Sequence, residues 1–432
     1  MHQQKITFIG GGSAKFVREV VVDLFSYPGL QNSHIVLMDI NRERVERSGR
    51  IVKKIIQELN IPATVSITTD QREAVAGASH IIITIMVGGY DAYQRDVAIP
   101  ARHGVYQTVS DTTGPGGVFR TVRTTPVLRK IATDVLELAP DAWVLNYANP
   151  MSMNVLALQR SGLKRVVGLC HSIQHLCRQF ARWLDLPADE IHYTAGGINH
   201  INFYLTVTHQ GLDLYPLLLA QKDRIVKEEP AEITRFELLE YLGYFPAEGP
   251  HHQSEYYPWF RKDEAAVKRT AAETFWGYHL DRQNFHDRTA EIEAQISGAK
   301  PISYARSVEY GAQIVQALEG GEAQVFYGNV PNNGLIENLP PDSIAEVPCL
   351  VDSNGIVPGR VGRIPGQLAA VMLPHIALHD LAVTGTFAKD RRLIHQAVQA
   401  DPLTGAILTL PKIKELVDEM FAANQEYAAD WK

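Results

Sequence analysis

Short, uninterrupted apolar runs separated by helix-like segments dominate the first 170 residues of this 432-residue chain. The runs lie at residues 5–9, 35–38, 80–84, 143–145 and 166–169. A strand with one solvated face alternates apolar and polar side chains, whereas a strand that is apolar throughout is buried on both faces. Because helical patterns stand between the runs, we predict an α/β fold with a doubly wound parallel sheet covered by helices on both sides.

A glycine turn follows the first of these runs. Gly10, Gly11, Gly12 and Ser13 stand between the predicted strand and an amphipathic helix, and Asp39 ends the next strand. Glycine lets the backbone approach a pyrophosphate, and the helix N-terminus adds amide groups and a positive dipole. An acid at the end of the second strand can bind the ribose hydroxyls of NAD and would repel the 2′-phosphate of NADP. The pattern predicts a Rossmann-type NAD site, with an unliganded tight turn as the alternative.

The pattern of helices and strands expected from the sequence changes near residue 195. Residues 191–207 are predicted to form strands joined by a glycine turn, and two long helices are expected after about residue 363. A chain of this length suggests two domains. We therefore expect a Rossmann-like NAD-binding domain at 1–195 and a C-terminal α+β domain at 196–432, with the active site between them.

The composition argues against several classes of partner. The net charge is -7, and no long basic run suggests a surface for nucleic acid or anionic membranes. Three cysteines are too few for a disulfide framework, which favours a reducing compartment. The first residues lack the pattern of a signal peptide, and no apolar run reaches the roughly 20 residues of a membrane span. We expect a cytoplasmic protein.

A cysteine and a histidine stand at positions that suit an open metal site. Cys170 ends the run at 166–169, and His200, in GGINHINF, follows the predicted glycine turn. One thiolate and one imidazole leave coordination positions free, which suits a metal that binds substrate oxygens. The alternatives are an inert buried cysteine and a turn histidine. Cys177 is interpreted as a core residue.

Three further segments are rich in polar side chains. Residues 146–150 end a strand with Asn149 and a helix-starting proline, and residues 110–117 form a predicted loop that contains Asp111. Residues 251–257 hold five ionisable side chains in seven positions. Asn, Asp, Pro and Gly also form ordinary turns, so turns and a solvated loop are the alternatives.

Taken in order, these motifs resemble those of a known family. KITFIGGGSAKF, LMDI, VGGYDAY, DTTGPGG, NYANPM, VGLCHSI, GINHINFY and NNGLIENLP…EVPCLVDSNGI extend over almost the entire chain. They resemble glycoside hydrolase family 4, and within it the α-galactosidases of the melibiase type, since Cys-His-Ser-Ile is similar to the pattern of that group. The resemblance implies a fold like that of lactate and malate dehydrogenases.

The resemblance also implies an unusual glycosidase reaction, to which the two-carboxylate scheme does not apply. Bound NAD takes a hydride from C3 of the sugar, a base removes the C2 proton, and the aglycone leaves C1 by elimination. A divalent metal ion, with Mn²⁺ as the first candidate, stabilises the negative charge that develops on the sugar when the C2 proton is removed. Water then adds, and the hydride returns to C3. The substrate would be a small unphosphorylated α-galactoside such as melibiose.

Residue roles follow from the same resemblance. Cys170 and His200 correspond to metal ligands, and His171 corresponds to a proton donor for the leaving group. Asn149 resembles a sugar-binding asparagine, and Asp111 resembles an acid that contacts the substrate. The base is Tyr or Asp from the second domain, and Tyr256 is favoured over Tyr257.

Other activities remain open at this point. An α-galacturonidase or α-glucosidase of the same family is the nearest alternative. A dehydrogenase of 2-hydroxy acids or sugars would share the fold but would need no Cys–His metal pair. A non-catalytic sensor of NAD or sugar is the third class. The resemblance also implies a homo-oligomer, either a dimer or a tetramer.

Overall fold

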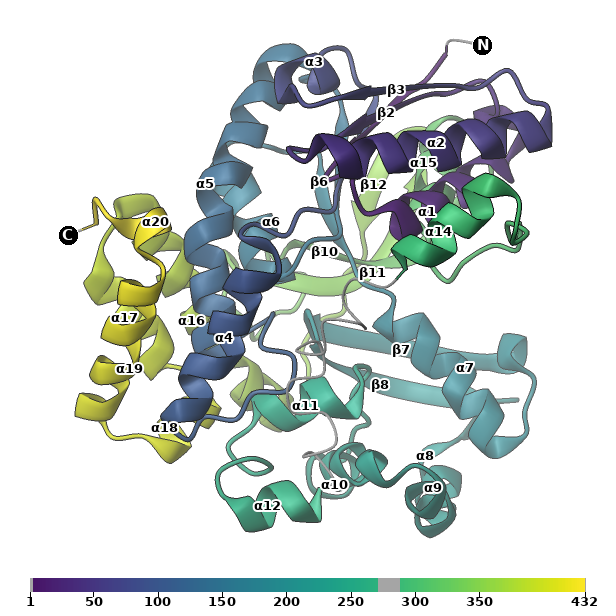
Figure 1. Cartoon of the computed structure of the whole chain (residues 1–432). Helices are drawn as coiled ribbons and strands as arrows, with labels where there is room; N and C mark the ends of the chain where they lie inside the picture. Colours follow the sequence, from purple (N-terminus) through teal and green to yellow (C-terminus); the bar gives the residue numbers. More distant parts are fainter. Residues whose placement is uncertain (1–2, 271–287, 432) are drawn as a thin grey trace.

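The computed structural model describes residues 3–270 and 288–431. One sheet runs through the molecule in the strand order β3-β2-β1-β4-β5-β6-β10-β11-β7-β8-β9, with β12 beside β11 (Figure 1). Its first six strands are parallel and have the order of a dinucleotide-binding sheet, which confirms the predicted doubly wound fold. These strands are β1 (Lys5–Ile9), β2 (His34–Met38), β3 (Thr64–Thr68), β4 (His80–Ile83), β5 (Trp143–Asn146) and β6 (Val166–Leu169).

Both faces of the parallel strands are buried, because successive side chains of a strand point to opposite faces. Ile82 and Leu145 belong to an apolar cluster with α1, α2 and α15. Ile81 and Val144 belong to a second cluster with α5, α6 and α16 on the other face. The helices are α1 (Ala14–Phe25), α2 (Arg42–Leu59), α3 (Gln71–Val75), α4 (Gly89–Arg102), α5 (Gly114–Leu138), α6 (Met151–Arg160), α15 (Gly311–Leu318) and α16 (Gly366–Ala388).

The sequence prediction missed the edge strand β3. Its residues, TVSIT, are half-buried or exposed, so the strand lacks the apolar run that marks the central strands. The side chain of Asn41 accepts a hydrogen bond of 3.1 Å from the amide of Arg44 and caps α2.

The second half of the chain extends the same sheet. The antiparallel strand β10 pairs with β6 and carries β11, to which the β7–β8 hairpin is attached. A third apolar cluster lies between this hairpin and α7, α8 and α10. The elements are α7 (Ser172–Leu184), β7 (Ile191–Ile198), β8 (Ile201–His209), β9 (Leu212–Asp213), α8 (Tyr215–Ala220), α9 (Lys222–Glu228), α10 (Ile233–Leu242), α11 (Pro250–Tyr256), α12 (Glu264–Arg269), α14 (Thr289–Ser297), β10 (Gln324–Pro331), β11 (Ile344–Asp352) and β12 (Gly355–Pro358).

The predicted glycine turn between the two strands is wrong. Gly196 and Gly197 lie inside β7, and the hairpin turns at Asn199 and His200. A Cβ on Gly197 would lie 2.6 Å from the carbonyl oxygen of Ile201, so the close pairing of the hairpin requires glycine there. His200 takes the left-handed conformation of the turn, with φ of 64°. The division near residue 195 stays a prediction, and that residue lies in β7.

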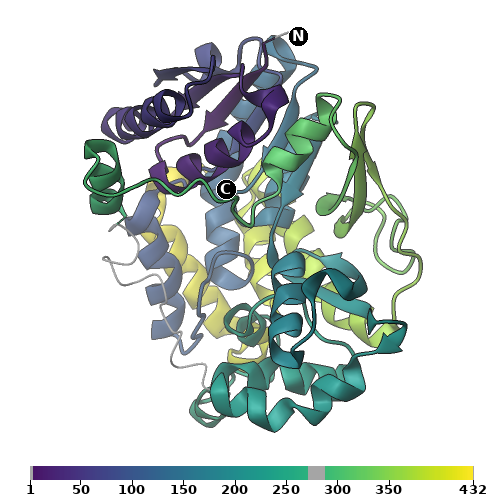
Figure 2. The same ribbon diagram turned by 90° about the vertical axis from the view of Figure 1, so that its right-hand side faces the viewer.

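The chain ends in α17 (Arg391–Gln399), α18 (Pro402–Ile407), α19 (Leu410–Ala423) and α20 (Gln425–Ala428). Among the described helices, α16 is long and apolar enough to cross a membrane, but 56 % of its most apolar window is buried in the protein. It packs on α5, α6 and α17, as a core helix does. Figure 2 shows the β7–α12 segment (teal) at the opposite end of the molecule from β1–β3 (purple).

Candidate active site

A cavity of about 450 Å³ lies where the parallel strands end. Its lining includes residues that directly follow these strands and residues from the second half of the chain. The former are Ser13, Thr84, Asn149, Cys170 and His171, and the latter are His200, Glu248, His252 and Glu309. Ligands of doubly wound proteins bind at the carboxyl ends of the strands, and pockets of this size hold small molecules.

Ser13, the last residue of the glycine turn, lines this cavity. Asp39 accepts hydrogen bonds of 2.9 Å from the amides of Gly12 and Asn41, and a Cβ on Gly12 would lie 2.5 Å from the Asp39 carboxylate. Ser13 is the N-cap of α1, but its side chain caps no backbone amide. The amide of Ala14 donates to the carbonyl of Gly12 at 3.1 Å, which leaves the amides of Lys15 and Phe16 as the ones that can face an anion. Gly10, Gly11, Gly12, Ser13 and Asp39 thus lie together and fit a dinucleotide.

Cys170, His200 and Glu248 form a group of possible metal ligands in the same cavity. The Cys170 Sγ, one ring nitrogen of His200 and one Glu248 oxygen all lie within 4.8 Å of one another. His200 Nε2 is 3.4 Å from Glu248 Oε2, which is 4.0 Å from the thiol. One sulfur, one nitrogen and one oxygen with open positions fit a divalent cation. A second group within the described residues, Asp111 with His252, shares His200.

Electrostatics in this group favour a bound cation. Burial raises the pKa of the Cys170 thiol to about 12, and Glu248 adds to that rise. Burial also acts to raise the pKa of Glu248, but His200 and His252 outweigh it and hold that pKa below its usual value. A positive ion would stabilise both the thiolate and the carboxylate.

His200 is oriented by hydrogen bonds to its other ring nitrogen. Its Nδ1 lies 2.9 Å from Thr112 Oγ1 and 3.1 Å from the hydroxyl of Tyr256, and Gln253 donates to its carbonyl oxygen at 2.7 Å. Partners of this kind fix the ring orientation and the tautomer of a metal-binding histidine. They leave Nε2 directed towards Cys170 and Glu248.

Asp111 and Asn149, predicted from separate motifs, are in direct contact. Asn149 donates a hydrogen bond of 2.8 Å to one carboxylate oxygen of Asp111, and the hydroxyl of Thr112 donates to the other at 2.9 Å. Burial acts against ionisation, but His252, Arg120 and His200 keep the pKa of Asp111 well below its usual value. Asn149 lines the cavity, and its amide is held by the ionised carboxylate of Asp111.

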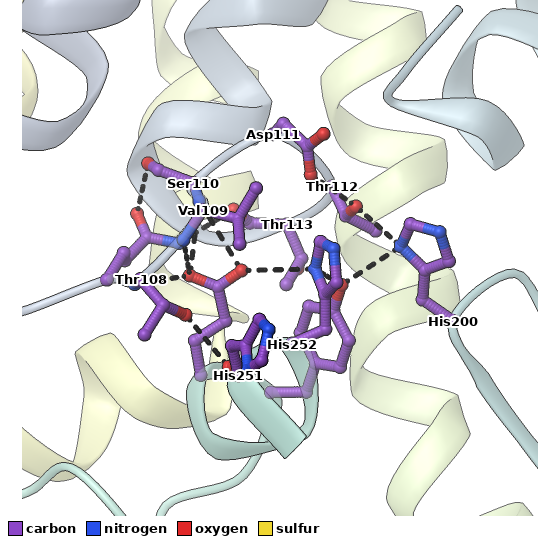
Figure 3. A network of polar contacts seen from close by, with 12 residues as sticks. Thr108, Val109, Ser110, Asp111, Thr112, Thr113, His200, His251 and His252 are labelled. Atoms are coloured by element: carbon purple, nitrogen blue, oxygen red, sulfur yellow. Dashed lines mark hydrogen bonds and ion pairs between the residues drawn. The ribbon is translucent and has the colours of Figure 1, made fainter. Parts of the chain in front are cut away.

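The loop that carries Asp111 is held by α11. The buried carboxylate of Glu255 accepts hydrogen bonds of 2.9, 3.2 and 3.2 Å from the amides of Thr108, Val109 and Ser110 (Figure 3). The predicted loop at 110–117 is shorter than expected, because α5 begins at Gly114. Residues 250–256 form the largely buried helix α11, so the solvated-loop alternative for residues 251–257 is wrong.

Comparison with known proteins identifies the family. The model of "Family 4 glycosyl hydrolase" matches residues 5–186, and the model of its C-terminal domain matches residues 195–404. The chain belongs to glycosyl hydrolase family 4. An α-galactosidase of Bacillus subtilis (strain 168) is 34 % identical over 99 % of this chain and 100 % of its own length. An α-galactosidase of Rhizobium meliloti is 33 % identical over 98 % and 89 %, and an α-galacturonidase of Lachnoclostridium phytofermentans is 30 % identical over 98 % and 96 %.

Solved structures agree on the fold. A 6-phospho-α-glucosidase from gut microorganisms in complex with NAD and Mn²⁺ covers 100 % of both chains with a TM-score of 0.83 at 21 % identity. A malate dehydrogenase of Plasmodium falciparum in complex with NADH covers 91 % of this chain and 100 % of its own, with a TM-score of 0.51 at 14 % identity. The predicted dehydrogenase-like fold of this family 4 hydrolase is confirmed.

The two tyrosines considered as the base lie in different surroundings in the family 4 hydrolase. The hydroxyl of Tyr256 is 3.1 Å from His200 Nδ1 and 2.8 Å from His252 Nδ1. Burial raises its pKa well above the ordinary value, and Glu255 adds to that rise. Tyr257 donates instead to Gln253 at 3.0 Å. Tyr256 therefore stays the favoured prediction, and it would ionise only beside a bound cation.

His171 lies half-exposed at the cavity. Its Nδ1 is 3.0 Å from Glu309 Oε1, and this hydrogen bond raises the pKa of the imidazole to about 9 despite burial. The ring can therefore carry a proton at neutral pH, as the predicted proton donor requires. Cys177 is buried, as expected.

The sequence analysis missed several members of this site. His252 and Glu255 stand in the segment 251–257, which was recognised only as rich in ionisable groups, and Glu248 lies three residues before it. Glu309 lies 138 residues after its partner His171, and no spacing rule connects the two. An acidic residue just before the two adjacent histidines 251 and 252 is the signal that could have indicated Glu248.

Proposed function

We propose that this family 4 hydrolase cleaves unphosphorylated α-galactosides such as melibiose, and that it uses NAD and a divalent metal ion. Mn²⁺ is the first candidate for this ion. One observation carries the proposal: the glycine turn and the Cys170–His200–Glu248 group open onto the same cavity. Support also comes from the two α-galactosidase relatives, which align along nearly the whole chain. NAD and Mn²⁺ are present together in the similar 6-phospho-α-glucosidase.

The residues present suit both groups. When bound, NAD would accept and return a hydride, and the divalent ion would act as a Lewis acid beside developing negative charge. Cys170, His200 and Glu248 would hold the ion. Gly10, Gly11, Gly12 and Ser13 would hold the pyrophosphate, and Asp39 would bind a ribose.

The remaining polar side chains would handle the sugar. Asn149 and Asp111 would hydrogen-bond its hydroxyls, because the Asn149 amide lines the cavity and the ionised Asp111 carboxylate is in contact with that amide. His171, held by Glu309, would give a proton to the leaving oxygen. Tyr256 would remove a proton from the sugar, since its hydroxyl lies against the metal-binding His200.

The charges at the cavity favour a neutral sugar. Among the described residues that line it, Arg120 is the one lysine or arginine, and it interacts electrostatically with Asp111. A 6-phosphate or a uronate would require a cation without such a counter-charge. An α-galacturonide is the second candidate substrate, because the α-galacturonidase of Lachnoclostridium phytofermentans is 30 % identical over 98 % of this chain.

The test is hydrolysis of 4-nitrophenyl α-galactoside by protein stripped of metal and nucleotide. Mn²⁺, NAD⁺ and a thiol are added back singly and together, while absorbance reports NADH. We expect turnover only with Mn²⁺ and NAD⁺ together and without accumulation of NADH. Turnover without either, or NADH formed in step with product, would contradict the proposal. Preference for the galacturonide in a parallel assay would favour the second candidate.

Two further predictions accompany this function. A cytoplasmic location and a homo-oligomer, either dimer or tetramer, stay predictions. Gel filtration with light scattering would measure the oligomeric state.

A further inference from the structure

A second cavity of about 540 Å³ adjoins the first. His171 and Glu248 line both cavities and therefore lie at their common boundary. The other walls come from α7, from the 3₁₀ turn Pro230–Glu232 with the start of α10, and from residues 247–251. None of the roles assigned above uses this space.

The wall opposite the boundary is a fixed polar surface. Arg235 and Glu232 are buried and form a two-pronged ion pair with distances of 2.6 and 2.5 Å. The same guanidinium donates to Gln179 Oε1 at 2.7 Å and lies 5.5 and 5.2 Å from the ring centres of Trp183 and Phe245. Such groups are held in place before a ligand arrives, so they bind it with little loss of side-chain entropy.

The charges in the second cavity are matched in pairs. Arg235 is paired with Glu232, and the Glu229 carboxylate accepts hydrogen bonds of 2.9 Å from Arg182 and from the indole of Trp183. No lysine or arginine among the described residues lining the cavity is left without an acidic partner. A neutral ligand rich in hydroxyl groups suits this surface better than a phosphorylated or carboxylated one.

His175 supplies hydrogen-bonding capacity at the mouth. It stands one helical turn after His171 on α7, with 6.5 Å between the ring centres. The imidazole is exposed and has no hydrogen-bond partner within the described part of the chain. A neutral imidazole can donate to one hydroxyl and accept from another.

We propose that the second cavity binds the leaving-group sugar of the α-galactoside, with His175 as a specificity-determining residue. The inference rests on the proposed function, because a proton donor at His171 must touch the oxygen between the two sugars. Since His171 lies at the boundary of the cavities, a galactose beside Cys170 and Asn149 leaves the second sugar in the cavity lined by His175.

The test compares melibiose, which has a sugar as leaving group, with methyl α-galactoside, which does not fill the second cavity. His175→Ala should lower kcat/KM for melibiose about tenfold, the effect of one or two lost hydrogen bonds, and should change kcat/KM for the methyl glycoside less than about twofold. Arg178→Ala, an exposed change on the same helix that does not line the cavity, is the matched control and should affect neither substrate.

A second variant fills the space instead of removing a contact. Ala231 lines the cavity, so Ala231→Phe should exclude the leaving-group sugar and lower melibiose turnover about tenfold or more while sparing the methyl glycoside. Equal losses on both substrates, or no loss on either, in both variants would overturn the inference. Failure of the proposed function is distinguishable, because the unmodified enzyme would then cleave neither α-galactoside.

Discussion

The parallel sheet and the β7–α11 region build their parts of the site in different ways. In the sheet, the functional candidates directly follow strands: Asp39 after β2 and Cys170 after β6. In the β7–α11 region, His200, Gln253 and Glu255 are buried polar residues joined to one another or to neighbouring loops by hydrogen bonds. Burying polar groups is unfavourable unless they are paired. Backbone geometry therefore defines the first part of the site, and a side-chain network defines the second.

The largest expected effect comes from Cys170, at the junction of the two regions. Cys170→Ser should lower kcat/KM about 10³-fold, because the loss of the thiolate ligand weakens the binding of the metal ion that acts as Lewis acid at the reacting sugar. Metal analysis of the dialysed variant should show less bound Mn²⁺. Cys177→Ser is the matched control, since this thiol is buried on α7 away from the cavity. Equal activity in the two variants would show that Cys170 is not a ligand.

Tyr256 and Tyr257 offer a comparison within the network. Tyr256→Phe should lower kcat about 10²-fold, as expected for a lost general base. Tyr257→Phe removes only the hydrogen bond to Gln253 and should keep most of the activity. Steady-state kinetics on methyl α-galactoside measures both. A Tyr256→Phe enzyme with normal kcat would assign the base elsewhere.

Glu255 tests whether the network positions the Asp111 loop. Glu255→Ala leaves three buried amides without their acceptor, which should lower the free energy of unfolding by about 2–3 kcal/mol and kcat/KM about 30-fold. Glu255→Gln keeps one acceptor oxygen and should recover most of both. Urea unfolding and kinetics provide the measurements. A stable, fully active alanine variant would mean that the loop holds its shape without α11.

A substitution at Gly12 tests the part of the site that backbone geometry defines. Gly12→Ala would place a Cβ 2.5 Å from the Asp39 carboxylate, so the turn must shift. NAD⁺ should bind about tenfold more weakly by calorimetry, a change of about 1.4 kcal/mol. Mn²⁺ affinity measured without nucleotide should not change, because neither Gly12 nor Asp39 belongs to the metal group. A parallel loss of both affinities would contradict the separation of the two regions.

Asp401 is a buried carboxylate outside both regions and gives the smallest effect. It caps α18 through Thr404, while its Oδ1 has no partner among the described atoms. Burial raises its pKa from 3.8 to about 6. The folded state therefore gains stability from Asp401 below pH 3.8 and loses it as the pH rises through 6. Between pH 5 and 8 this loss is about 1 kcal/mol. Asp401→Asn should remove this pH dependence of the unfolding energy and leave activity unchanged. An identical slope in the variant would place the titration elsewhere.

The sheet and its strand ends were predictable from the sequence because the relevant signal is local. An apolar run predicts the strand, and the residues that come next in the sequence are the ones at the edge of the sheet. Gly10–Ser13, Asp39 and Cys170 each follow such a run. Edge strand β3 was missed for the opposite reason, since half-exposed strands carry no such run.

For the side-chain network of the β7–α11 region, the sequence indicated which segments contribute residues but not which side chains contact one another. The resemblance indicated His200 and Tyr256, but not that Thr112 and Tyr256 hold the same imidazole nitrogen. Glu248 and Glu309 reach Cys170 and His171 only through the packing of distant segments. Such contacts leave no periodicity or fixed spacing for sequence reasoning to detect.

The pairing of β6 with β10 has a mechanical consequence. Leu169 pairs with Gly328 and Gly168 pairs with Asn329, so the chain leaves the sheet just before Cys170 and later re-enters it on the adjacent strand. A hinge rotation that opened the region between these strands would have to break those backbone hydrogen bonds. The spacing between the nucleotide end of the cavity and the metal ligands is therefore established when the chain folds, and substrate binding does not have to establish it again.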